Sequence, residues 1–146
     1  MAIEMATTME GGSLRLMKEC ALLVEDEAKR MVGDDASYEL DISPLPSWKK
    51  LAESTLADKT QMGFSPPDRP LERYGDLKRS IQHVATPKEA VVGTDDPVAL
   101  LQEAGTTGAH PIPPRSFLGG AAVRKGPEIQ RKIGMGVESI LRSRRW

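Results

Sequence analysis

A single apolar stripe near the N-terminus is the strongest structural constraint in this chain of 146 residues. Apolar side chains recur there at every third or fourth position: Leu14, Met17, Ala21, Val24, Ala28 and Met31. This period predicts an amphipathic helix of about five turns, with Ser13 as its N-cap and Gly33 as its stop. The stripe is narrow, so it fits either a sheet of the same chain or a neighbouring subunit.

Prolines and glycines divide the middle of the chain into short elements. We expect a short helix after Ser47, one side of which carries Trp48, Leu51, Ala52, Thr55, Leu56 and Lys59. A further short helix fits residues 72–81, and residues 82–85 and 90–93 are typical of two strands joined by a turn. Pro97 fits the first position of another helix, which runs through residue 103 and ends at Gly105.

The C-terminal third contains a long loop and a second long helix. Three prolines make residues 106–114 a loop, as they do residues 61–70. We expect a strand or short turn over residues 115–118, and then a helix that opens at Pro127. One face of that helix carries Ile129, Ile133, Val137 and Ile140. Gly134 and Gly136 weaken it by roughly 1 kcal/mol each, unless they allow close backbone packing.

Together these elements predict one α+β domain over residues 13–146. A small antiparallel sheet packs against a long N-terminal helix and a C-terminal helix, with long loops between. Residues 1–12 lack periodicity and end in Gly-Gly, so we expect a flexible arm there. The longest apolar runs are only a few residues, and we therefore expect neither a membrane span nor a signal peptide. With Cys20 as the one cysteine, an internal disulfide is excluded, which fits a reducing compartment.

A net charge of −1 hides a gradient along the chain. Residues 1–45 carry a net charge of −6, residues 46–119 are neutral, and residues 120–146 carry +5. The C-terminal cations include Arg142, Arg144 and Arg145, for which three interpretations remain open. In the first, these side chains contact phosphates. In the second, they lie in solvent at a helix C-terminus, where the helix dipole stabilises positive charge. In the third, they attract the acidic first helix of another copy.

Residues that carry chemistry are few and scattered, so we expect no enzyme, no metal and no cofactor. His83 is placed in a strand, where a half-buried structural role fits, and His110 has no ligand partner at metal-site spacing. Asp95-Asp96 is explained as a helix cap, and Cys20 has no nearby histidine. The acidic and basic residues between positions 25 and 30 fall on or beside the helix face opposite the apolar stripe.

Five short segments, in one order, resemble a family of tailed-bacteriophage proteins. The segments are Trp48, Leu51, Thr55, Lys59, Gly63 and Pro70-Leu71; Gly75, Leu77, Ser80 and Ile81; Val92-Gly93-Thr94; Glu103, Gly105 and Thr106; and Ile112-Pro113, Arg115, Phe117, Leu118 and Gly119. Their order and spacing are similar to those of the virion-morphogenesis and tail-completion neck proteins. The resemblance covers roughly residues 14–141.

The last segment is the one with the clearest chemistry. Prolines stiffen the approach to Arg115, and Phe117 and Leu118 are suited to an apolar pocket. Arg115 suits a bidentate carboxylate partner within or between subunits. Two interpretations stay open: the segment pins the last helix to its own sheet, or it adds to a sheet at a subunit interface.

The resemblance implies a structural protein of the virion neck, assembled in the host cytoplasm. It implies a homo-oligomeric ring, expected to be sixfold, that contacts head-closure or connector proteins and tail-tube or terminator proteins. Genomic DNA would pass through the lumen without specific contacts. Within this class the alternative is a tail terminator that caps the tube. From another class, the alternative is a nucleic-acid-binding accessory protein that uses the basic C-terminal helix.

Overall fold

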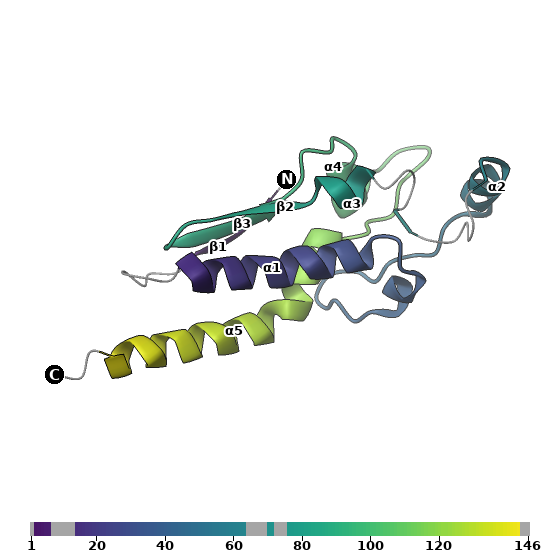
Figure 1. Ribbon diagram of the computed structural model, residues 1–146. Coiled ribbons are helices and arrows are strands. Elements are labelled where there is room, and N and C mark those ends of the chain that lie inside the picture. The colour runs from purple at the N-terminus through teal and green to yellow at the C-terminus, as the bar shows by residue number, and fades with distance from the viewer. Residues whose placement is uncertain (1, 7–13, 64–69, 72–75, 144–146) are drawn as a thin grey trace.

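Helix α1 (Leu14–Met31) begins and ends where the apolar stripe predicts it. The computed structural model describes residues 2–6, 14–63, 70–71 and 76–143, whose arrangement Figure 1 shows. The stripe from Met17 to Met31 is buried, so it faces the core. Gly33 follows the helix with a φ of 83°, as expected of a helix stop. Ser13, the predicted cap, lies outside the described residues.

The sheet is antiparallel, and its strands lie side by side in the order β1-β3-β2. Strands β2 (Gln82–Ala85) and β3 (Glu89–Gly93) form the predicted hairpin, in which Val84 lies opposite Val91. Strand β1 (Ala2–Ala6) pairs with the other side of β3. β3 is therefore the central strand, and β2 is an edge strand.

Strand β1 corrects part of the arm that we expected over residues 1–12. Residues 2–6 pair with β3 in a continuous antiparallel register from Ala2↔Gly93 to Ala6↔Glu89. A strand of five residues carries little pattern of its own, and its backbone partner lies far along the chain. The remaining arm residues, 7–12, lie outside the described residues.

Helix α5 (Phe117–Ser143) begins earlier than predicted, so the expected strand or turn over residues 115–118 was wrong. Pro127 lies inside this helix instead of opening it. Its ring removes one backbone donor, and its side chain is exposed, away from the packed face. Gly119 and Gly120 lie in the first turn of α5.

The short elements differ from prediction mainly in where they begin. Helix α2 (Glu53–Gln61) starts after Trp48 and Leu51, so these two side chains do not share its face. Helix α3 (Asp76–Ser80) lies within the predicted range of 72–81. Helix α4 (Ala99–Ala104) starts after Pro97, and Gly105 ends it as predicted, with a φ of 72°. A 3₁₀ helix, η1 (Asp35–Glu39), was not predicted.

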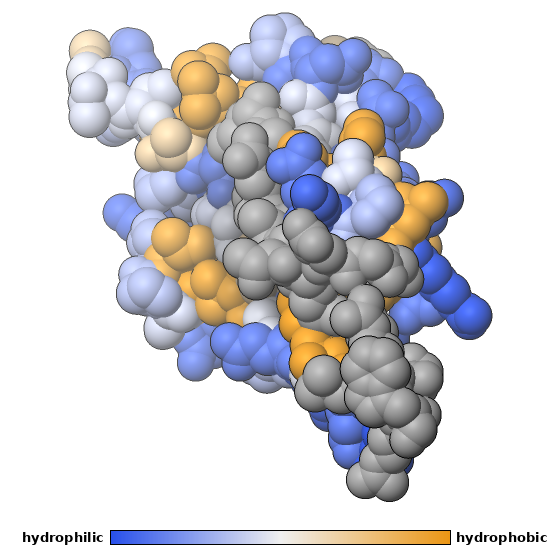
Figure 2. Space-filling model, turned by 90° about the vertical axis from the view of Figure 1, so that its left-hand side faces the viewer, coloured by the Kyte–Doolittle hydropathy of each residue, from blue (hydrophilic) through white to orange (hydrophobic). Residues whose placement is uncertain are grey.

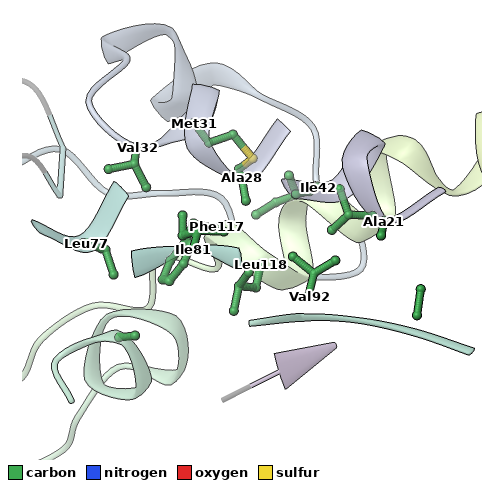
Figure 3. Close-up of a cluster of buried hydrophobic side chains, with 14 of the residues drawn as sticks. Ala21, Ala28, Met31, Val32, Ile42, Leu77, Ile81, Val92, Phe117 and Leu118 are labelled. Carbon is green, nitrogen blue, oxygen red and sulfur yellow. The ribbon is translucent and has the colours of Figure 1, made fainter. Parts of the chain in front are cut away.

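Both long helices lie on the same side of the sheet, with α1 next to the strands (Figure 1). The predicted α+β class is therefore confirmed: an antiparallel sheet packs against an N-terminal and a C-terminal helix. Figure 3 shows the core between these layers, where Phe117, Leu118 and Val92 are fully buried beside α1 residues such as Met31. Burying a side chain as large as phenylalanine contributes about 2–3 kcal/mol.

Helices α1 and α5 run in opposite directions (Figure 1). Two glycines of α5 lie close to side chains of α1. A Cβ on Gly120 would lie 3.0 Å from the terminal methyl of Met31, and one on Gly136 would lie 2.7 Å from a methyl of Leu16. Gly136 thus serves the close packing that the sequence left open. A Cβ on Gly134 would meet no described atom within 4 Å, so that glycine has no such role among the described residues.

Candidate functional site

The side chain of Arg115 is buried and holds two distant segments together. Its Nε and Nη2 atoms donate hydrogen bonds to the carbonyl oxygen of Lys49, at 3.1 and 2.8 Å, and Nη2 also reaches the carbonyl of Lys50 at 3.3 Å. Its backbone N–H donates to the carbonyl of Gln102 at 2.6 Å. In place of the carboxylate that we expected, Arg115 therefore binds backbone carbonyls. Burial lowers the pKa of Arg115, which the nearby Tyr38 partly offsets.

This contact also explains why α2 starts late. In an α-helix, the carbonyls of residues 49 and 50 would accept bonds from residues 53 and 54. Here they accept hydrogen bonds from the guanidinium of Arg115, and the chain is not helical from Trp48 to Leu51. Helix α2 begins only at Glu53. The side chain of Trp48 is buried in this segment.

The carboxylate of Glu103 caps the start of α5. Its Oε2 accepts the backbone N–H of Leu118 at 3.0 Å, and its Oε1 accepts that of Gly119 at 2.8 Å and contacts the hydroxyl of Ser116. The unpaired N–H groups of a helix start carry a partial positive charge, which a carboxylate stabilises. Glu103 therefore fixes where α5 begins, before the residue at which a proline signal predicted it.

Gly105 allows the chain to turn from α4 toward this cap. A Cβ at this position would lie 2.7 Å from the carbonyl oxygen of Ile112. The loop closes through two bonds: the N–H of Thr106 donates to the carbonyl of Ile112, and the N–H of Ile112 donates to the Thr106 hydroxyl, each at 2.9 Å. Pro113, half-buried, follows directly and leads into Arg115.

We call these residues the α5 anchor. It consists of Trp48, Lys49, Lys50, Glu103, Gly105, Arg115, Phe117 and Leu118. Phe117 and Leu118 are fully buried in the core of their own chain. Of the two interpretations that the sequence left open, these contacts favour the first, in which the segment pins the last helix to its own domain.

The other predicted motif residues lie elsewhere. Leu77 is buried in the core, and the Ser80 hydroxyl donates to the Leu77 carbonyl at 2.7 Å and contacts the Thr94 hydroxyl just beyond Gly93. On α2, Thr55 is half-buried and Lys59 is buried. The remaining motif glycine, Gly75, lies outside the described residues.

The charged residues of α1 are less exposed than their position in the sequence predicts. We expected residues 25–30 to lie on or beside the solvent face, yet Glu25 and Glu27 are buried. Arg124 of α5 donates to Glu27 Oε1 at 2.6 Å, and Arg30 donates to the same carboxylate at 2.7 and 3.0 Å. The hydrogen bond from Arg30, and then that from Arg124, outweigh burial and lower the pKa of Glu27 to about 2.

Part of the charge difference between the two ends of the sequence is thus neutralised by ion pairs within one chain. Besides the Arg124–Glu27 pair, Lys132 of α5 lies 3.7 Å from Glu19 of α1. Arg142 pairs with Glu138 one helical turn earlier, where both side chains are exposed. Arg144 and Arg145 lie outside the described residues. The antiparallel packing of α1 and α5 brings the acidic and basic ends of the sequence together.

The outer face of the sheet is not covered by either long helix. Val84 of β2 is 69% exposed, more than any other large apolar side chain described. It lies in an open groove of about 590 Å³ lined by Gln82, His83, Val84, Val91, Gly93, Thr94 and Asp95.

Figure 2 shows another surface, the end of the molecule where α1 begins and α5 ends. The hydrophobic residues on this surface form separate patches between hydrophilic ones.

Two further residues that the sequence analysis considered, Cys20 and Asp96, have places in the fold that explain them. Cys20 is buried within α1, and burial raises the pKa of its thiol. Asp96 caps the turn before α4, since its Oδ1 accepts the Val98 N–H at 2.9 Å. In the described part of the chain, no three histidine, cysteine, aspartate or glutamate side chains are grouped to hold a metal ion. None of the described helices combines the length and apolarity that a membrane span needs.

No protein-family model, no curated protein and no solved structure matches this chain.

Proposed function

We propose that this chain is a structural protein of the bacteriophage neck, which self-associates into a ring where the tail joins the head. The order and spacing of the five sequence segments support this proposal. So does the way in which the segments are used: Glu103, Gly105 and Arg115 act through backbone atoms of their own domain. Residues of this kind make a rigid building block.

The observation that carries self-association is the one-sided sheet. Helices α1 and α5 cover one face of the sheet (Figure 1). The other face exposes Val84 and its groove. β2 is an edge strand whose outer backbone groups have no strand partner in the described chain. Exposed apolar surface and an unpaired edge are both features that contacts between copies cover.

In the assembled neck, such a ring would contact a head-closure or connector protein on one side and a tail-tube or terminator protein on the other. DNA would pass through the lumen without base-specific contacts. The tail-terminator role remains the alternative within this class, because both roles require the same ring-forming building block.

The nucleic-acid alternative receives less support from the geometry. A protein that binds DNA through a basic helix needs cations free to approach phosphates. Of the five described cations on α5, four pair with a glutamate of the same chain: Arg124, Lys125, Lys132 and Arg142. A phosphate would have to compete with these carboxylates.

The test is the mass of the purified protein at micromolar concentration, measured by native mass spectrometry and imaged by electron microscopy. We expect a closed ring of one copy number. Val84→Lys should shift the protein toward monomers with an unchanged circular dichroism spectrum. The matched control is Met62→Lys. Met62 is 48% exposed and directly follows α2, which lies far from the sheet (Figure 1).

A monomeric wild-type protein would contradict the proposal. If that monomer also retards DNA in a gel, with an affinity that falls steeply with salt, the nucleic-acid alternative is the correct one. Equal assembly of the wild type and of Val84→Lys would show that the ring forms through another surface.

A further inference from the structure

A buried carboxylate joins the edge strand to the first helix. Glu25 of α1 is 8% exposed, and its two oxygens have different partners. Lys29 donates to Oε1 at 2.6 Å, and Nδ1 of His83 contacts Oε2. Burial raises the pKa of Glu25, but the hydrogen bonds from Lys29 and His83 outweigh it, so the pKa is lowered. At neutral pH, Glu25 therefore carries a negative charge.

His83 lies at the border between this buried carboxylate and solvent. It belongs to the edge strand β2, which pairs with β3 on one side and packs against α1. Its side chain is 24% exposed, which lets it exchange protons with water. The ionisable groups around it are Glu25 and Lys29 on α1, and Asp95, which follows β3 and lines the same groove.

We propose that His83 and Glu25 form a pH-sensitive clamp that holds β2 on α1. When the imidazole is neutral, its Nδ1–H donates a hydrogen bond to the ionised carboxylate of Glu25. When the imidazole is protonated, the same contact joins two opposite charges and becomes an ion pair, which strengthens it. Imidazole is the side chain type whose charge changes near neutral pH, so the clamp tightens as the pH falls.

The arrangement around Glu25 makes protonation of His83 effective. Lys29 occupies Oε1, which leaves Oε2 for the imidazole, so the two cations do not compete for one oxygen. The strand held in this way is the one that carries Val84 and borders the groove. Protonation of His83 therefore controls how firmly the exposed edge of the sheet is held.

The clamp is tested by hydrogen exchange of the hairpin amides, residues 82–93, at pH 5.5 and pH 8.0, with rates corrected for intrinsic exchange. In the wild type, we expect the hairpin to open about fivefold less often at pH 5.5, the effect of one strengthened hydrogen bond. His83→Gln retains a donor but does not titrate, so its corrected opening should not change between the two pH values.

Two further variants separate the clamp from general pH effects. His110→Gln, in the loop of residues 106–114, should retain the full pH dependence of the wild type, because that histidine lies outside the hairpin. Glu25→Gln should remove most of the dependence, since a neutral amide lacks the negative charge that attracts a protonated imidazole. Equal pH dependence in the wild type and His83→Gln would overturn the proposal, as would an undiminished pH dependence in Glu25→Gln. These measurements do not depend on whether the protein forms a ring.

Discussion

Glu27 is the residue whose replacement gives the most direct test of how α1 and α5 are held together. Its side chain is 5% exposed and accepts hydrogen bonds from Arg30 of its own helix and Arg124 of α5. The pKa of this carboxyl falls from 4.5 to about 2 in the folded protein. Since one pKa unit corresponds to about 1.4 kcal/mol, the ionised carboxylate stabilises the fold by about 3 kcal/mol at neutral pH.

The expected result is a pH-dependent loss of stability in Glu27→Gln. A lowered pKa means that the folded protein binds the proton less readily than the unfolded chain. The stabilisation is therefore complete above about pH 5 and disappears as the pH falls through about 2. We expect Glu27→Gln to be less stable than the wild type by about 3 kcal/mol at pH 7, and by about half as much at pH 3.

The assay is urea unfolding followed by circular dichroism at both pH values. The matched control is Glu138→Gln, which removes an ion pair between α5 residues that are 59% and 74% exposed. That control should cost less than about 0.5 kcal/mol, because water screens an exposed pair. A loss in Glu27→Gln that is the same at pH 7 and pH 3 would refute the reasoning, since it would point to packing instead of charge.

Three further predictions concern the α5 anchor, and denaturant unfolding measures each of them. Arg115→Met removes the hydrogen bonds to the carbonyls of Lys49 and its neighbour and should cost about 2–4 kcal/mol, whereas Arg115→Lys recovers only part because it lacks the planar fork. Gly105→Ala adds a clash to a strained φ and should cost more than about 2 kcal/mol. Gly63→Ala, with a φ of 84° and no described atom near its Cβ, should cost only about 1 kcal/mol. Glu103→Gln keeps an acceptor but removes the charge at the start of α5, so a loss of about 1 kcal/mol is expected, and no loss would show that the cap is neutral.

The parts of the fold that the sequence predicts are those with local causes. The α1 stripe repeats at the helical period over 18 residues, and the hairpin joins neighbouring strands through one turn. Both were predicted close to their observed bounds. Neither requires knowledge of a distant partner.

The parts that the sequence missed depend on atoms far along the chain. α5 starts where Glu103 of α4 meets its first N–H groups, whereas the sequence offers Pro127 as the visible start signal. β1 forms by pairing with the side of β3 that β2 does not occupy. α2 starts later than predicted because Arg115 donates hydrogen bonds to two carbonyls that precede it. Each of these is a backbone contact, for which a side-chain pattern gives no signal.

The candidate site shows the same division. The motif segments drew attention to Glu103, Arg115 and Phe117, which do lie together, but their partners are backbone atoms that no motif names. The buried carboxylates of Glu25 and Glu27 were missed, because spacing alone places them near the polar face. For Glu27, the sequence did contain a signal, namely the cations on α5 that could pair with it.

The pairing of α1 with α5 changes what the charge gradient means for assembly. Along the sequence, an acidic start and a basic end look suited to attract one copy to the next. In the fold, Glu27 and Glu19 already face Arg124 and Lys132 of the same chain. An ion pair made within one subunit cannot also be made between two without being broken first. The contacts that we propose between copies must therefore come from surface that the domain leaves unpaired, and the outer face of the sheet around the exposed Val84 is such a surface.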